Sequence, residues 1–238
     1  MQGAVRLIYP GQCVSCDERV EGRHGICGPC WRDTPFIEGA VCGQCGTPLM
    51  GGRPDEVSDC DDCLKTPRPW DGGRAAMLYR GNGRKLVLSF KHGNREDMAE
   101  PLAAWMVQRG RDMIMAGAIV VPVPLHWTRL VRRRYNQAAL LSRCIAKQAG
   151  LTHAPDALRR IKRTASLDRM SPEARERMLE NAFTIHPRWQ AALKGAQVLL
   201  IDDVMTSGAT LTEATQVLRR GGVASVHMLT LARAAKDA

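Results

Sequence analysis

The chain has 238 residues and 45% hydrophobic content, which suits one medium domain with a smaller one, and its formal net charge is +10. The sequence does not open on a charged segment followed by a long apolar stretch, and its longest apolar run ends in prolines. We therefore expect neither a signal peptide nor a membrane span, and we expect a cytoplasmic location. The basic excess gathers in residues 129–134 and 159–163. It indicates either a solvated surface or contact with a polyanion, which can be a nucleic acid or a small pyrophosphorylated substrate.

Eight of the nine cysteines form four Cys-x-x-Cys pairs before residue 64. Each pair can present two thiolates on one tight turn, and two pairs complete a tetrahedral zinc site with no open coordination position, so the expected role is structural. Disulfides are the alternative, but they are rare in a reducing compartment, and a thioredoxin-like redox motif would not be repeated four times. The expected zinc ligands are Cys13, Cys16, Cys27, Cys30, Cys42, Cys45, Cys60 and Cys63.

Sequential pairing is the simplest arrangement, with residues 13–30 supplying one set of four and residues 42–63 the other. A cross-braced arrangement, and a count of one or two ions, are both compatible with the spacing. A segment this short with few large apolar side chains cannot build a core alone, so bound metal is expected to supply the missing stability. The proline-rich, charged run at residues 64–69 then marks a boundary. We expect a zinc-ribbon domain at 1–68 and a second domain at 69–238.

Beyond this boundary, apolar patterns of strand and helix type alternate along the chain. Strands are expected at residues 74–79, 118–123, 182–185, 198–201 and 225–231. Helices are expected at residues 83–91, 98–108, 136–148, 171–179 and 211–220. Strands that alternate with helices predict an α/β fold with a mostly parallel sheet.

The segment from Val198 to Thr210 is the most informative part of the chain, because four apolar residues precede two adjacent acids and a run of small hydroxyl residues around a glycine. The apolar run is typical of a strand buried on both faces. Asp202 and Asp203 are then expected at its carboxyl end, where open α/β sheets bind ligands. Gly208 lets a ligand approach the backbone, and the N–H groups that begin the next helix bind anions.

Paired acids beside such an anion site suit a sugar phosphate, with the acids on two vicinal ribose hydroxyls and the turn on the 5′-phosphate. The magnesium-binding strand of a nucleotide hydrolase is the alternative, but the chain has no Gly-x-x-x-x-Gly-Lys-[Ser/Thr] loop. The segment resembles the phosphoribosyl-pyrophosphate (PRPP) motif of type I phosphoribosyltransferases, and this implies catalytic roles for Asp202 and Asp203. The implied PRPP-binding residues are Val204, Met205, Thr206, Ser207, Gly208, Ala209 and Thr210.

Two further segments lie where the resemblance implies contact with pyrophosphate. One is the loop after the strand expected at 118–123, and the other is an arginine run whose guanidinium groups suit phosphate oxygens. The implied pyrophosphate-binding residues are Val123, Pro124, Leu125, Arg133 and Arg134. The basic segment 159–177, with Arg163 as a catalytic cation, can close over PRPP and offset the charge on departing pyrophosphate. A solvated basic loop is the alternative.

Over almost its whole length the sequence resembles the ComF (competence protein F, GntX-like) family. The resemblance is carried by the four cysteine pairs, the run Phe90-Lys91-His92-Gly93, residues 121–126 and 133–137, Arg163-Thr164, and residues 201–210. That family joins an amino-terminal zinc ribbon to a type I phosphoribosyltransferase-like domain. The resemblance therefore implies an α/β fold with a mostly parallel sheet and flanking helices, plus a small cysteine-rich double zinc ribbon.

The leading functional hypothesis is a phosphoribosyltransferase that binds PRPP with Mg²⁺ and transfers ribose 5-phosphate to an unidentified nitrogen acceptor, in a role linked to DNA uptake. The alternative is a non-catalytic, PRPP-sensing module whose ribbon and basic face bind single-stranded DNA or a DNA-processing partner. Aromatic residues are sparse, and Trp31 and Phe36 in the ribbon suit a small core better than a stacking platform. A third possibility is that the ribbon is a structural lid with no nucleic-acid partner.

Overall fold

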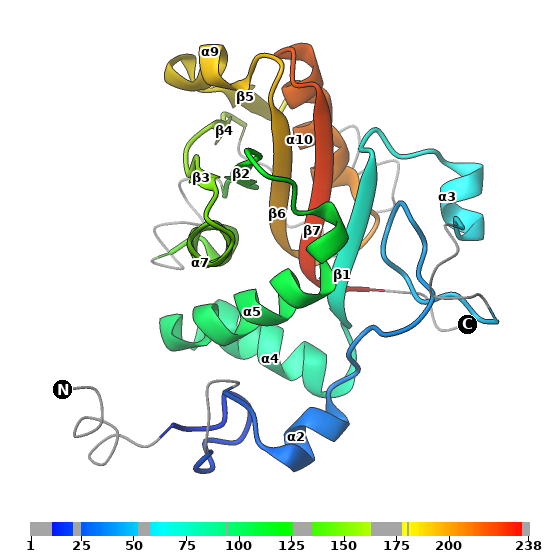
Figure 1. Ribbon diagram of the computed structural model, residues 1–238, viewed down its shortest axis with the longest axis vertical. Helices are drawn as coiled ribbons and strands as arrows, with labels where there is room; N and C mark the ends of the chain where they lie inside the picture. Colours follow the sequence, from blue (N-terminus) through cyan, green and yellow to red (C-terminus); the bar gives the residue numbers. More distant parts are fainter. Residues whose placement is uncertain are drawn as a thin grey trace.

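A five-stranded parallel sheet organises the computed structural model, which describes residues 11–20, 25–51, 58–93, 95–125, 135–162, 178–179 and 181–234. The strand order is β1-β7-β6-β2-β3 (Figure 1). The strands are β1 (Gly72–Leu78), β7 (Ser225–Arg233), β6 (Gln197–Met205), β2 (Ile119–Pro122) and β3 (Thr152–His153). A separate antiparallel pair consists of β4 (Leu158–Arg160) and β5 (Phe183–Ile185).

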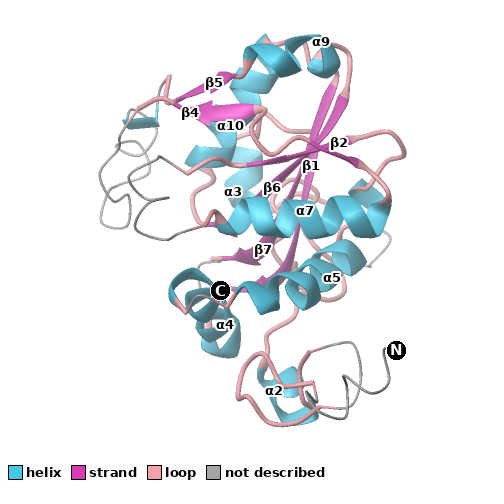
Figure 2. Ribbon diagram, turned by 90° about the vertical axis from the view of Figure 1, so that its left-hand side faces the viewer, coloured by secondary structure: helices cyan, strands magenta, loops and turns pink. Residues whose placement is uncertain are grey.

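Helices lie on both faces of the sheet (Figure 2). The α-helices are α2 (Gly28–Asp33), α3 (Asp61–Lys65), α4 (Gly81–His92), α5 (Ala99–Arg109), α7 (Gln137–Ala149), α9 (Gln190–Leu193) and α10 (Ala209–Arg220). Short 3-10 helices are η1 (Glu96–Met98), η2 (Arg111–Met113) and η3 (Pro187–Trp189). Among the described residues, no helix is long and apolar enough to cross a membrane.

The alternating side chains of β6 divide the core into two layers. Leu199 and Ile201 pack with α4, α5 and α7, whereas Val198 and Leu200 pack with α9 and α10. All four side chains are fully buried or nearly so. A strand that is apolar on both faces is what a covered parallel sheet requires, so the expectation of a central, doubly buried strand is confirmed.

The ribbon covers the outer edge of β1. Phe36 forms an antiparallel bridge to Met77, and the backbone N–H of Ile37 donates to the Ala76 carbonyl at 3.0 Å. An uncovered edge strand would offer unpaired N–H and C=O groups to other chains. The ribbon therefore completes the sheet that follows it, and the domain boundary expected near residue 68 stays a prediction.

The expected elements agree with the structure except at their ends and in several short elements that were not expected. Strands β1, β2, β5, β6 and β7 and helices α4, α5, α7 and α10 all fall where the sequence pattern placed them. The helix expected at 171–179 lies almost wholly outside the described residues. The short strands β3 and β4 were not expected, because two or three residues carry no readable alternation.

Candidate active site and metal centres

The acid pair stands where β6 extends past its neighbour β2. The register of β2 with β6 ends at Pro122 and Ile201, whereas β7 accompanies β6 to its end at Met205. The strand thus ends four residues later than the sequence pattern indicated, because β7 supplies a partner for the acidic residues as well. Asp202 and Asp203 consequently lie on ordered strand backbone at the carboxyl edge of the sheet, where parallel α/β folds bind ligands.

Lys91, near the end of α4, is the residue that sequence analysis left without a role. Its Nζ lies 3.1 Å from Asp203 Oδ2, and the two side chains are only 16% and 15% exposed. The signal available in the sequence was its place in the Phe90-Lys91-His92-Gly93 run, but no local pattern connects that run to a strand more than a hundred positions away. One carboxylate of the pair is therefore neutralised by a lysine.

The second carboxylate is held in an environment that opposes its ionisation. Burial, together with the charge of Asp203, raises the pKa of Asp202 to about 7. The backbone N–H of Asp203 donates to Asp202 Oδ1 at 2.8 Å and, with the charges of Lys91 and Arg160, partly offsets that rise. A carboxyl group poised near neutrality is a frequent property of functional sites, because a structural role does not require it.

Residues at the start of α7 hydrogen-bond the backbone at Lys91. The Tyr135 hydroxyl donates to the Phe90 carbonyl at 2.7 Å, and Gln137 Nε2 donates to the Lys91 carbonyl at 3.3 Å. Tyr135 and Gln137 are both buried. Tyr135 is therefore a core residue rather than an exposed surface on which a base could stack.

Asn136 performs two tasks at the start of α7. Its Oδ1 accepts from the Ala138 N–H at 3.1 Å, which caps the helix, and its Nδ2 donates to the Val123 carbonyl at 3.1 Å. Val123 also donates its own N–H to the Ile201 carbonyl at 2.8 Å. The loop of Val123, Pro124 and Leu125 is thereby fixed beside the end of β6, next to the acid pair. Arg133, Arg134, Arg163 and His126 lie outside the described residues.

The turn from Thr206 to Thr210 joins the acid pair to α10. Gly208 has φ +88°, a left-handed conformation that L side chains rarely adopt. A Cβ there would also meet the Met205 methyl at 2.9 Å. Thr206 is exposed, and Ser207 and Thr210 are partly exposed. The turn therefore places hydroxyl groups at the start of α10, where Ser207 Oγ accepts from the Ala209 N–H at 3.4 Å, and a helix start of this kind can bind an anion.

The eight paired cysteines form two separate clusters. Their sulfurs meet in the sequential sets 13/16/27/30 and 42/45/60/63, and within each set all ligand atoms lie within 4.8 Å of one another. Cys16 and Cys27 are 3.7 Å apart at sulfur, as are Cys45 and Cys60. A zinc tetrahedron with bonds of about 2.3 Å has sulfur–sulfur edges of about 3.8 Å. The clusters therefore fit one ion each, in the sequential rather than the cross-braced arrangement.

The local electrostatics favour ionisation of one thiol in each cluster, Cys13 and Cys42, whereas burial and the neighbouring cysteines raise the pKa of Cys30, Cys45 and Cys63. A hydrogen bond from the Cys45 thiol, joined by backbone N–H donors, lowers the pKa of Cys42 to about 4. Burial works against ionisation of Cys13, but donors that include the Cys27 N–H outweigh it and lower its pKa to about 6. The deprotonated thiol is the form that ligates metal.

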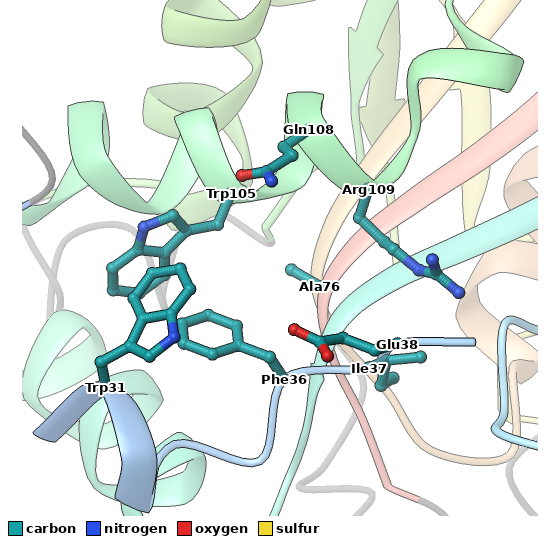
Figure 3. A pocket seen from close by; sticks show the side chains of 8 residues that line it. All are labelled: Trp31, Phe36, Ile37, Glu38, Ala76, Trp105, Gln108 and Arg109. Carbon is teal, nitrogen blue, oxygen red and sulfur yellow. The ribbon is translucent and has the colours of Figure 1, made fainter.

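A separate cavity of about 170 Å³ lies between residues 31–38 of the ribbon and α5 (Figure 3). Trp31 and Phe36 are in contact with centroids 4.3 Å apart, and both meet the edge of Trp105 from α5. The opposite wall carries Glu38 and Arg109. Trp31 is 39% exposed, so the ribbon aromatics are only partly a core. The cavity shares no lining residue with the acid pair.

These features define a class of protein, in which a double zinc ribbon is joined to a phosphoribosyltransferase-type sheet. The double zinc ribbon domain family matches residues 4–64, and the phosphoribosyl transferase domain family matches residues 146–238. The second match contains the acid pair and the turn that follows it.

Curated relatives match over nearly the whole chain. "DNA utilization protein YhgH" of Salmonella typhi is 32% identical over 95% of this chain and 99% of its own length. "Competence protein F" of Haemophilus influenzae is 29% identical over 94% and 97%. "Competence protein ComFC" of Bacillus subtilis is 27% identical over 87% and 84%. The chain belongs to the ComF family.

Proposed function

We propose that the chain binds PRPP at the carboxyl edge of the sheet. Asp202 and Asp203 accept hydrogen bonds from the ribose hydroxyls, and the turn at residues 206–210 holds the 5′-phosphate. The observation that supports this most directly is the order of parts along the backbone: two acids on the overhanging end of β6, then a left-handed glycine turn, then the start of α10. A sugar phosphate spans such a site from its hydroxyls to its phosphate.

The reaction we propose is transfer of ribose 5-phosphate to a nitrogen nucleophile. The C1–O bond to pyrophosphate breaks, the bond from C1 to the acceptor nitrogen forms, and pyrophosphate leaves with the bonding electron pair. Mg²⁺ bound with PRPP would neutralise pyrophosphate charge, and the acid pair fits it because magnesium uses few protein carboxylates. The backbone at residues 123–125 lies beside the acids for the leaving group, and Lys91 holds Asp203 in place. Arg133, Arg134 and Arg163 stay predicted contacts of pyrophosphate.

Titration calorimetry with Mg²⁺-PRPP tests the site. The parent chain should bind, and the Asp202→Asn/Asp203→Asn variant should lose binding at least a hundredfold, since two hydrogen-bonding carboxylates disappear, each worth about 1.5–3 kcal/mol. Asp112→Ala is the matched control, because that acid is 52% exposed and pairs with Arg74 rather than with site residues. Binding that survives the double substitution would refute the proposal, as would no binding by folded parent.

A role linked to DNA uptake is the setting we propose for this chemistry, supported by the competence and DNA-utilization names of the relatives. The cavity at Trp31 favours a second candidate function, which is contact with single-stranded DNA. The partly exposed indole can stack a base while the guanidinium of Arg109, on the opposite wall of the cavity, meets a phosphate.

The second function predicts quenching of tryptophan fluorescence by oligothymidylate, with affinity that falls steeply as salt rises. Trp31→Ala should weaken binding about tenfold, because stacking contributes about 1–3 kcal/mol per base. Trp189→Ala is the control, because that indole donates to Asp156 Oδ1 at 2.9 Å in η3, outside the ribbon. Equal loss in both variants would argue against the cavity as the contact site.

A further inference from the structure

The second cysteine cluster (42/45/60/63) is built into the sheet beside the phosphate turn. Trp70, which is 2% exposed, donates its indole N–H to the Gln44 carbonyl at 2.6 Å, inside the Cys42-x-x-Cys45 turn. The Gly73 N–H on β1 donates to the Gly43 carbonyl at 2.8 Å. Cys42, Cys45 and Cys63 share one hydrophobic layer with Met205 and Ala209, which flank the turn.

Arg68 connects this cluster to the turn directly. Its Nη1 donates to the Ser207 carbonyl at 2.9 Å, and, while burial raises the pKa of the Cys63 thiol, the Arg68 side chain acts to lower it. A Cβ placed on Gly208 would lie 3.3 Å from Arg68 Nη1 and 3.2 Å from the Trp70 ring. The arginine and the tryptophan therefore pack against the glycine that gives the turn its shape.

Arg233 holds the turn from the end of β7. Its Nη1 donates to the Thr206 carbonyl at 2.6 Å and to the Met205 carbonyl at 3.3 Å. The side chain is 5% exposed, and its charge acts on the Cys45 thiol. Two guanidinium groups thus hold the carbonyls of consecutive turn residues, and each of them acts electrostatically on a thiol of the same cluster.

A buried guanidinium is costly unless an opposite charge lies near it. Two thiolates balance the two charges of Zn²⁺, so four thiolates on one ion leave a net charge of about −2. That charge matches the two arginines. Protonated, metal-free thiols would remove this negative charge from beside the buried Arg233 and the partly buried Arg68, and the carbonyls they hold would be fixed less firmly.

We propose that the second cluster, when it carries zinc, is the electrostatic support of the phosphate turn, and that Arg68 is the positioning residue that transmits its state to the bound 5′-phosphate. The proposal rests on PRPP binding as proposed above. It assigns the two clusters different tasks. The first cluster is fastened to the start of α4 instead, where Ser15 Oγ donates to Asn82 Oδ1 at 2.7 Å and Asn82 Nδ2 donates to the Cys30 carbonyl at 3.2 Å.

The test measures the affinity for Mg²⁺-PRPP by titration calorimetry and the number of zinc ions per chain by elemental mass spectrometry. Arg68→Ala should keep two zinc ions and weaken binding about tenfold, a typical size for coupling between sites. Arg68→Lys, which keeps the charge, should recover part of the affinity. Cys60→Ser should lose one zinc ion and weaken binding to the same extent as Arg68→Ala.

Arg95→Ala is the matched control. Arg95 is an arginine of similar placement at the first cluster, where its Nη1 lies 3.2 Å from Asp17 Oδ1, and its removal should leave PRPP affinity unchanged. The double variant Arg68→Ala/Cys60→Ser should bind PRPP no more weakly than whichever single variant has the lower affinity. Both changes break the same connection between the cluster and the turn, so their effects should not add.

Three outcomes overturn the inference. Unchanged affinity in Arg68→Ala, with the parent binding PRPP, refutes it while the proposed function stands. Additive losses in the double variant refute the linkage between arginine and cluster. No binding by the folded, zinc-loaded parent refutes the proposed function together with the inference. If Cys60→Ser fails to fold, Arg68→Ala still decides the matter, because it leaves every cysteine in place.

Discussion

Replacing Asp202 by asparagine should stabilise the fold and weaken PRPP binding at the same time. The pKa of Asp202 is raised from its ordinary 3.8 to about 7 in the folded chain, chiefly because of burial and the neighbouring charge of Asp203. A pKa raised by folding means that the folded state resists ionisation. The contribution of Asp202 to the unfolding free energy therefore falls as pH rises from 3.8 to about 7 and is level beyond that range.

The magnitude follows from the difference between the two pKa values. Each pKa unit corresponds to about 1.4 kcal/mol, so Asp202→Asn should be more stable than the parent by about 4 kcal/mol at pH 8 and by about 2 kcal/mol at pH 5.5. The asparagine Oδ1 can still accept from the Asp203 N–H, so the existing hydrogen bond is kept.

Urea denaturation of zinc-saturated protein at the two pH values measures this difference. Asp203→Asn serves as the comparison and should not be stabilising, because it removes the ion pair with Lys91. A stability difference between Asp202→Asn and the parent that is the same at both pH values would refute the electrostatic argument. So would a variant that is less stable than the parent at pH 8.

Three further predictions concern the turn, the helix start and the metal. Gly208→Ala should cost at least about 1–2 kcal/mol, because φ is +88° and the new Cβ would press on Met205; thermal melting measures the loss, and an unchanged melting temperature would show that the turn relaxes freely. Asn136→Ala should cost about 1 kcal/mol through the lost helix cap, whereas Asn136→Ser should restore most of it; equal stability of the two variants would contradict the capping argument. Chelation of zinc should unfold the ribbon and uncover the edge of β1. Circular dichroism should show a loss of ellipticity, and a dye that binds exposed hydrophobic surface should bind more. Readdition of zinc should reverse both changes if metal drives the folding.

The sequence was sufficient to predict those features whose signal lies within a short stretch of the chain. The apolar run before the acid pair predicted a doubly buried strand, since every side chain from Val198 to Ile201 must face one packed layer or the other. The cysteine pairs predicted structural metal binding by one or two ions, because their spacing alone brings two thiolates onto one turn, and the structure gathers them in two clusters. The amphipathic pattern at residues 136–148 predicted a helix, and in the structure Asn136 caps it.

Contacts between distant segments could not be predicted in this way. Lys91 ends a helix whose pattern reports only which face is buried, and its pairing with Asp203 depends on how α4 packs on the sheet. The extra length of β6 depends on β7, a partner that follows it in the chain. Arg68 lies in a proline-rich run that resembles a linker by composition, yet it bonds to Ser207, which is 139 positions away.

That last contact changes how the two halves of the chain should be understood. The ribbon covers the β1 edge through Phe36, reaches the phosphate turn through Arg68, and accepts at its Gln44 carbonyl from Trp70 in the sheet's own core layer. A phosphoribosyltransferase-type sheet separated from this ribbon would have an open edge and a turn without one of its two guanidinium supports. Deletion of residues 1–68 should therefore reduce PRPP affinity as well as solubility, whereas a ribbon that only recruits a partner would leave the affinity of the remaining domain intact.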